Sequence, residues 1–340
     1  MLHARHIARF SSALLALSVL AAAGCTTPPK VTAVSPVASY EATVSPPADL
    51  LTVPLTGATP PQDAVVPTVP VCAKVHDDGV HATSGVGSAD VVYETADSGA
   101  GTQLACLFQS ESPTRIGPIA PVGMPDLWIV PQYRAMLFSA GSTPSLATSM
   151  KRWPGMSDAS RGNVGVDAAY SSSYVLGHEA ARLADTYSAS VTSETAARLR
   201  FAESNPATAN PIVGLSVPLS PSFEAFWQFD ALSGTYLRNV NRKAARDALD
   251  HKRISAKNVV VLWTRYTALD PDLAGGGFDV TLGGQGQASV FRDGERFDGK
   301  WKADGNTPPR FVAEDGSPIR LAPGNTWFEV IRLSANITLR

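Results

Sequence analysis

The sequence lacks a large excess of charge of either sign, and its body lacks long hydrophobic runs. Its 340 residues carry 28 basic and 30 acidic side chains, so the formal net charge at pH 7 is −2. Proteins that bind nucleic acid usually present a basic face, and we therefore expect no nucleic-acid partner. Beyond the N-terminal segment, no stretch approaches the ~18 consecutive apolar residues of a membrane-spanning helix. We expect the body of the protein to lie outside the membrane.

The sequence also lacks the local motifs of most cell-envelope enzymes. It contains no Ser-x-x-Lys pair, no His-Glu-x-x-His motif and no Gly-x-Ser-x-Gly elbow, which excludes the recognisable forms of serine and zinc catalysis. His76-Asp77-Asp78-x-x-His81 contains the side-chain types of a metal site, but not at the helical i, i+4 spacing. Between two strand-like runs, this segment is more simply a polar turn. We therefore assign no catalytic residue, no metal site and no cofactor.

Carboxylate-based catalysis leaves no local motif, because its two acidic residues need only meet in space. Glu94 is the first candidate for such a residue, with Asp97 and Glu111 as further members. A cell-wall hydrolase or transferase that uses carboxylates therefore stays open as an alternative function.

Cysteine is scarce, and the first of the three cysteines indicates where the protein is found. Cys25 follows a short basic segment, an apolar run over 10–23 and a final group of small residues. This is the layout of a secretory signal, with a lipobox-like end at which an exported chain is diacylated on cysteine and cleaved before it. Ala22 departs from the leucine usual in a lipobox. An uncleaved anchor is the alternative, but ~14 apolar residues are too few for a ~20-residue span. We expect a signal peptide over 1–24 and a lipid anchor on the extracytoplasmic face of the cell membrane.

The other two cysteines, Cys72 and Cys106, form an even pair. Outside the cytoplasm such a pair is expected to form a disulfide. Each lies in a strand-like run, VCAKV or LACLF, so that neighbouring strands could bring them together. The alternative is two buried free thiols that pack as small hydrophobic side chains.

Composition divides the mature chain into a tether and two domains. Residues 26–70 contain ten prolines and only four charged side chains, a composition that favours extended conformations. We expect a proline-rich tether over 25–53 that begins at the lipidated cysteine. A second segment rich in proline, asparagine and serine, near 206–221, separates a domain over 54–205 from another over 210–335.

The two domains differ in their predicted elements. Strand-like runs at 71–77, 89–96 and 102–110 precede a stretch over 112–131 whose prolines and glycines predict a long ordered loop. A helical stretch follows over 173–202, so the N-terminal domain is predicted to be α+β or α/β. The C-terminal domain is predicted to be β-rich, with a hairpin at VFRDGERF, where Asp-Gly suits a type I′ turn.

Several short motifs follow one another in the order and approximate spacing of a known family. They are Pro54-Leu55-Thr56-Gly57, Ala73-Lys74-Val75, Ala89-Asp90-Val91-Val92-Tyr93-Glu94, Ile116-Gly117-Pro118, Tyr236-x-Arg238, Asp247, Lys257-Asn258-Val259-Val260-Val261, Gly284-x-Gly286, Asp293-Gly294, Gly299-Lys300-Trp301 and Pro323-Gly324-x-Thr326-Trp327. In these motifs the chain resembles the YerB-like lipoproteins (DUF3048), a two-part domain of unknown function, over about 54–333. The resemblance implies a membrane-anchored, extracytoplasmic lipoprotein and supplies no established activity.

The chain departs from this family at three arginine positions in the N-terminal half. Gln103, Ala120 and Gly123 stand where the resemblance implies arginine. Clustered arginines suit the bidentate binding of a carboxylate or a phosphate. If the family binds an anion at these positions, this chain has weakened or lost that ability.

These observations favour a non-catalytic binding or scaffolding module near cell-wall assembly. Its expected partners are the membrane, through the N-terminal lipid, and an envelope protein or a cell-wall glycan. A solute-binding lipoprotein with a cleft between its two halves is a further alternative. A concave pocket lined by Glu94, Arg238 and other polar groups would favour an enzyme or solute capture, whereas a flat aromatic face would favour a partner.

The C-terminal half retains more of the family's motifs, so we look there for a binding face. The candidate binding residues are Glu94, Tyr236, Arg238, Asp247 and Trp301. Tyr236 and Arg238 stand two residues apart on a predicted strand and should share one face. The alternative is structural, with Arg238 paired to Asp247 and the tryptophans packed in the β core.

Overall fold

The computed structural model describes residues 52–99, 101–150, 174–188, 198–270 and 277–340. The chain divides into two compact units, Met1–Pro47 and Ala48–Arg340, and every described residue belongs to the second. The signal peptide expected over 1–24, Cys25 and nearly all of the expected tether lie outside the described residues. Within the described part, no helix has the length and apolar character needed to cross a membrane.

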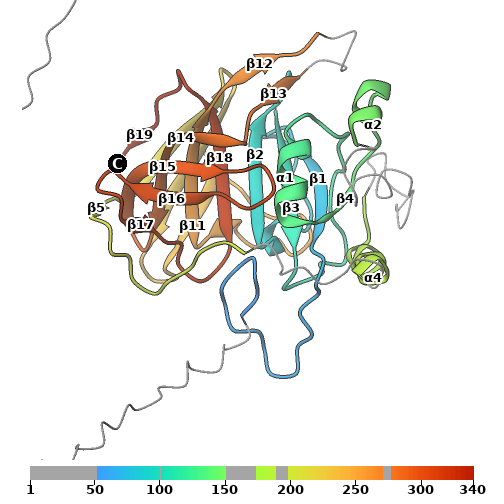
Figure 1. Ribbon diagram of the computed structural model, residues 1–340, viewed down its shortest axis with the longest axis horizontal. Helices are drawn as coiled ribbons and strands as arrows, with labels where there is room; N and C mark the ends of the chain where they lie inside the picture. The colour runs from blue at the N-terminus through green and yellow to red at the C-terminus, as the bar shows by residue number, and fades with distance from the viewer. Residues whose placement is uncertain (1–51, 100, 151–173, 189–197, 271–276) are drawn as a thin grey trace, which may run out of the picture. The chain divides into compact units, whose positions relative to one another are not determined.

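Most strands join one large mixed sheet of eleven strands (Figure 1). They are β1 (Val71–Asp77), β2 (Val91–Ala96), β3 (Thr102–Phe108), β4 (Met136–Phe138), β5 (Asn210–Pro211), β11 (Asn258–Thr264), β14 (Gly284–Arg292), β15 (Glu295–Ala303), β16 (Arg310–Ala313), β17 (Pro318–Ile319) and β18 (Thr326–Arg332). Their order is β17-β16-β15-β14-β11-β18-β2-β3-β1-β4, and β5 pairs with the first residues of β15. Strand β18 runs parallel to β11 and β2, and β1 runs parallel to β4.

The pairing of β18 with β2 joins the N-terminal and C-terminal segments of the chain. Val92 lies opposite Trp327 in this parallel ladder, and Glu94 lies opposite Glu329. The two segments expected as separate domains therefore share one continuous network of strand hydrogen bonds. Any site built on both strands draws its residues from both segments.

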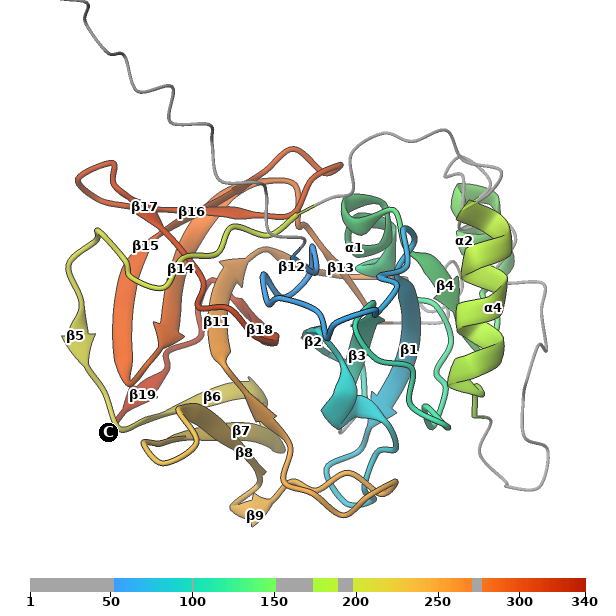
Figure 2. The same ribbon diagram turned by 90° about the horizontal axis from the view of Figure 1, so that it is seen from below.

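A second, smaller sheet packs against one face of the large sheet. Its strands are β6 (Gly214–Ser220), β7 (Phe223–Asp230), β8 (Thr235–Val240), β9 (Lys243–Ala244), β10 (Ser255–Ala256) and β19 (Thr338–Leu339). Side chains alternate between the two faces of a strand, so Trp227 on β7 and Arg238 on β8 point to the large sheet. There they contact Glu329 and Glu94. Figure 2 shows β6, β7 and β8 as a layer beside β11 and β18.

The described helices lie in the N-terminal segment. They are α1 (Asp126–Tyr133), α2 (Pro144–Met150), α4 (Gly177–Ser188) and the short 3-10 helix η1 (Val86–Ser88). Helix α1 packs on the face of the large sheet that the small sheet leaves open. Lys74 on β1 forms a buried ion pair with Asp126 at 2.9 Å, and the hydroxyl groups of Tyr93 and Tyr133 are 2.8 Å apart.

The described C-terminal segment forms strands, including the separate pair β12 (Tyr266–Ala268) and β13 (Phe278–Val280). The fold therefore has two sequence segments and is rich in β structure, with its helices in the N-terminal segment. This agrees with the β-rich C-terminal half that the sequence predicts.

The loop expected over 112–131 is wrong in its last part, because α1 begins at Asp126 and includes Pro131. Proline in a helix removes one backbone donor and is costly in the middle of a long helix. Here it is the sixth of eight residues, so little helix follows it. The side chain of Asp126, the first residue of the helix, accepts a hydrogen bond from the backbone N–H of Gly123 at 2.7 Å, which connects the helix to the loop before it.

Candidate functional site

A cluster of charged side chains is buried where the two sheets meet. The guanidinium of Arg238, on β8, donates from Nη1 to Asp77 Oδ2 at 3.0 Å and from Nη2 to Glu94 Oε1 at 2.7 Å. Arg238 is 1% exposed and Glu94 is fully buried. Because unpaired charges are very costly in the protein interior, this arginine and its two carboxylates depend on one another.

Glu94 is held by further donors besides Arg238. Thr102 Oγ1 donates to Glu94 Oε1 at 2.7 Å, and Trp327 Nε1 donates to Glu94 Oε2 at 2.9 Å. The guanidinium of Arg238 also lies over the Trp327 ring, 4.7 Å from its centroid, which is a cation–π contact. Burial raises the pKa of the Glu94 carboxyl, and the charge of Arg238 opposes this effect.

Glu329 is a third buried carboxyl in the same cluster. It lies opposite Glu94 on the neighbouring strand, and its Oε1 accepts a hydrogen bond from Trp227 Nε1 at 2.7 Å. Its Oε2 has no partner among the described residues. Burial and the adjacent charge of Glu94 raise the pKa of Glu329 well above its usual value. A proton on Glu329 therefore reduces the repulsion between the two carboxyl groups.

The cluster connects the sheets and offers little access to a reactant. A general acid or base must come within hydrogen-bond reach of its substrate. Glu94, the first candidate for carboxylate catalysis, is fully buried with both oxygens engaged. Its geometry therefore supports a structural role in joining β2 to the small sheet.

The structural alternative for Arg238 predicts an ion pair within the fold. Arg238 does form buried ion pairs, but the predicted partner is wrong. Asp247 does not pair with Arg238. Its carboxylate instead accepts backbone hydrogen bonds from Gly85, Gly87 and Leu249, each at 2.8 Å. Asp247 therefore attaches its own loop to η1, while Asp77 and Glu94 neutralise the arginine.

Tyr236 and Arg238 share one face of β8, as predicted, but this face is buried. The Tyr236 hydroxyl accepts a hydrogen bond from the backbone N–H of Gly294 at 3.2 Å. Trp301 is 2% exposed, and its Nε1 donates to the backbone oxygen of Trp263 at 3.1 Å. The expected aromatic binding face is therefore wrong, because these rings fill the core.

The expected disulfide between Cys72 and Cys106 is also wrong. Ala73 lies opposite Cys106, and Cys72 lies opposite Leu107. Paired residues point to the same face and successive residues to opposite faces, so the two sulfur atoms lie on different sides of the sheet. Both cysteines are buried free thiols, and burial raises the pKa of each. Neither is therefore an activated nucleophile.

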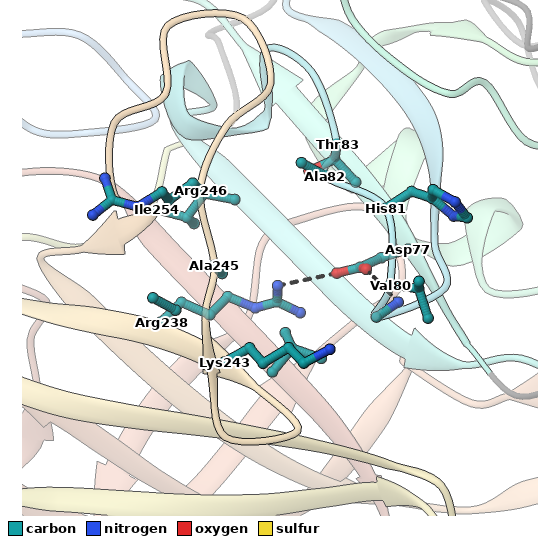
Figure 3. A pocket seen from close by; sticks show the side chains of 13 residues that line it. Asp77, Val80, His81, Ala82, Thr83, Arg238, Lys243, Ala245, Arg246 and Ile254 are labelled. Carbon is teal, nitrogen blue, oxygen red and sulfur yellow. Dashed lines mark hydrogen bonds and ion pairs between the residues drawn. The ribbon is translucent and has the colours of Figure 1, made fainter.

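A pocket of ≈ 160 Å³ opens beside the buried cluster (Figure 3). It is lined by Asp77, by residues 79–83, by Arg238 and Val240, and by residues 243–246 with Ile254. In Figure 3 the Lys243 side chain extends toward Val80. Arg246 instead donates to the backbone oxygen of His251 at 2.9 Å. Glu94 does not line this pocket.

Two hydrogen-bond donors of this pocket have no acceptor in the described part of the chain. Arg238 Nε is buried without a partner. The ammonium group of Lys243, on β9, lies on an exposed residue and pairs with no described carboxylate. A buried donor without an acceptor is costly, which applies to Arg238 Nε, and Lys243 adds a positive charge at the mouth of the pocket. The pocket is therefore suited to a group that supplies acceptor oxygens.

Sequence reasoning missed Asp77 and Glu329 as members of the cluster. Asp77 ends β1, and in the sequence it indicates only a polar turn. Glu329 carried a signal, since it stands alone in the apolar strand TWFEVIR, where an unpaired charge would be expensive. The sequence could not identify Arg238 as the nearby cation, because the two residues come from different sheets.

The positions at which the resemblance implies arginine gather in one region. Gln103 and Ala120 line a second pocket, and Gln103 and Gly123 line a third. None of these three residues is charged, so the expected loss of an anion-binding arginine cluster stays a prediction about this region. Across the described residues, no three metal-ligating side chains come together in a way that could hold a metal ion.

Comparisons with known proteins find similarity over both segments. The family model for a protein of unknown function (DUF3048), N-terminal domain, matches residues 55–180, and the model for its C-terminal domain matches residues 215–328. The crystal structure of the YerB protein from Bacillus subtilis is similar, with a TM-score of 0.71 and 20% sequence identity. The alignment covers 85% of this chain and 99% of that chain. No curated protein matches the sequence.

Proposed function

The chain belongs to the DUF3048 family, since the models of both its domains match, and from this premise we propose a lipid-anchored binding protein on the extracytoplasmic face of the cell membrane. Its N-terminal segment would serve as an α/β unit, built on β1–β4 with α1, α2 and α4, and its C-terminal segment as the β-rich unit. The protein binds rather than transforms its ligand, close to cell-wall assembly. The anchor is Cys25, which follows the secretory signal.

The pocket in Figure 3 carries this proposal, because Arg238 Nε is buried there without an acceptor and the exposed Lys243 adds a positive charge. A compact anionic group, such as the carboxylate or phosphate of an envelope protein or a cell-wall glycan, would accept hydrogen bonds from Arg238 Nε and Lys243 Nζ. Hydrogen bonds to charged groups are about twice as strong as neutral ones. The burial of Glu94 argues against the alternative of a carboxylate-based hydrolase or transferase.

Substituting Lys243→Met should weaken the binding of inorganic phosphate or acetate about 10- to 100-fold, because one charge-assisted hydrogen bond contributes about 1.5–3 kcal/mol. Isothermal titration calorimetry would measure both anions against the wild-type chain. The matched control is Lys300→Met, which removes an exposed lysine on β15. Equal anion affinities of the wild-type chain and Lys243→Met would contradict the proposal.

The anchor is tested separately from the ligand. Substituting Cys25→Ala should release the protein into the medium or leave an unprocessed precursor, because the acylated side chain is removed. Fractionation of intact cells, with mass spectrometry of the N-terminal peptide, would measure this. Normal cleavage together with unchanged membrane retention would exclude the lipid anchor.

A further inference from the structure

A second pocket, of ≈ 620 Å³, lies beside the turn that follows β1. His81 and Ala82 line both this pocket and the one in Figure 3. His76 lines the second pocket and Asp77 the first, because successive strand residues point to opposite faces. The polar turn HDDGVH therefore separates two pockets with different lining residues.

The second pocket has an acidic lining. Asp78 and Asp97 line it together with His76 and His81, and its described lining includes neither lysine nor arginine. Asp78 is paired with the His81 ring at 2.7 Å, so Asp97 is the carboxylate that faces a ligand. The nearby ammonium of Lys74 is already paired with Asp126. The other residues on one wall are Pro118, Ile119, Ala120 and Pro121, which present an apolar surface. The pocket therefore favours a cation that carries a short apolar chain.

Two buried atoms of this pocket have no hydrogen-bond partner among the described residues, namely Gln103 Oε1 and His76 Nδ1. Gln103 Nε2 donates to Asp97 Oδ2 at 3.1 Å, which orients the amide so that its oxygen is left as an unused acceptor. His76 Nδ1 is 3.8 Å from Asp97 Oδ2, too far for a hydrogen bond. Native proteins rarely leave such atoms unsatisfied.

The side chains of His76, Gln103 and Asp97 lie next to one another at this pocket. His76 and Gln103 lie opposite each other on β1 and β3, so their side chains leave the same face of the sheet. Asp97 follows β2 and contacts both of them. With its proton on Nε2, the His76 ring accepts at Nδ1. The group thus contains a carboxylate oxygen, an amide oxygen without a partner and a ring nitrogen without a partner.

We propose that this pocket binds the primary ammonium group of an alkylamine. An ammonium group has three N–H donors, which match Asp97, Gln103 Oε1 and His76 Nδ1, and its charge matches the acidic lining. The alkyl chain packs along the wall formed by residues 118–121. A quaternary ammonium has the same charge but no N–H donor, and an anion is repelled. This site is independent of the proposed anion pocket.

The test compares n-butylammonium with butyltrimethylammonium at constant ionic strength, by isothermal titration calorimetry on the full chain. We expect saturable binding of n-butylammonium and at least ~10-fold weaker binding of the trimethyl compound. Asp97→Asn keeps the shape of the side chain and should weaken n-butylammonium binding about 10- to 100-fold. Gln103→Met, which removes the amide oxygen, should weaken it in the same direction. Lys243→Met should bind n-butylammonium like the wild-type chain.

Several results would overturn the proposal. They are the absence of saturable n-butylammonium binding, equal affinities of the wild-type chain and Asp97→Asn, and equal binding of the two amines. Thermal melting would show whether a variant is folded. The side chain of Asp97 is 25% exposed, so its isosteric replacement should leave the fold intact. Titration of the same samples with phosphate measures binding at the anion pocket alone. A lack of phosphate binding would therefore contradict the proposed function, whereas a lack of amine binding would contradict only this inference.

Discussion

Replacement of Arg238 by methionine is expected to lower the free energy of unfolding by about 3–5 kcal/mol, the usual cost of removing one partner from a buried ion pair. Methionine keeps most of the side-chain volume but leaves Asp77 and Glu94 without their cation. It also removes the cation–π contact with Trp327. Urea denaturation followed by tryptophan fluorescence would measure the change.

The matched control for this variant is Arg310→Met, which removes an exposed arginine on β16. Surface substitutions of this kind usually change stability by less than ~0.5 kcal/mol. A loss below about 1 kcal/mol for Arg238→Met would mean that the buried cluster does not hold the two sheets together. The binding of an anion through Nε would then be the main role left for this arginine.

The two adjacent glutamates should respond very differently to the same isosteric change. In Glu94→Gln, either orientation of the amide points its NH₂ group at a donor, because Oε1 and Oε2 both accept hydrogen bonds. We expect a loss of about 3 kcal/mol or more. In Glu329→Gln the NH₂ group can replace Oε2, which has no described partner. We expect a change within about 1 kcal/mol at neutral pH.

The same pair predicts a pH dependence whose sign follows from the raised pKa of Glu329. The folded chain keeps a proton that the unfolded chain loses above about pH 4.3. The stabilisation that comes from this retained proton is fully present below about pH 4.3. It is lost as the pH rises through the pKa of Glu329 in the folded chain, at up to ~1.4 kcal/mol per pH unit. Unfolding free energies between pH 4 and 9 should therefore fall for the wild-type chain relative to Glu329→Gln. A constant difference would mean that Glu329 is not protonated in the folded state.

Local pattern in the sequence was sufficient for much of the β structure. The hairpin at VFRDGERF is confirmed, since Asp293 and Gly294 connect β14 to β15 with φ values of 54° and 77°, both positive as a type I′ turn requires. The shared face of Tyr236 and Arg238 also followed from strand alternation. Such features depend on residues that are neighbours in the chain.

Features that depend on pairing between distant strands could not be predicted. Cys72 and Cys106 were correctly expected on neighbouring strands, but a shift of one residue in the register decides whether two side chains share a face. The composition of the charged cluster was hidden for the same reason. Its residues Asp77, Glu94, Arg238 and Glu329 belong to four strands in two sheets.

The β2–β18 pairing also has a consequence for the order in which the chain can fold. Glu94 receives its hydrogen bond from Trp327, which is 233 residues later in the sequence. Contacts between such distant residues form slowly, because closing a long loop costs entropy before any contact compensates for it. Until β18 is present, β2 has an unpaired edge of the kind that promotes aggregation. During synthesis the chain must therefore be nearly complete before β18 can pair with β2. Fragments produced by a cut between the two segments would each retain an unpaired strand edge.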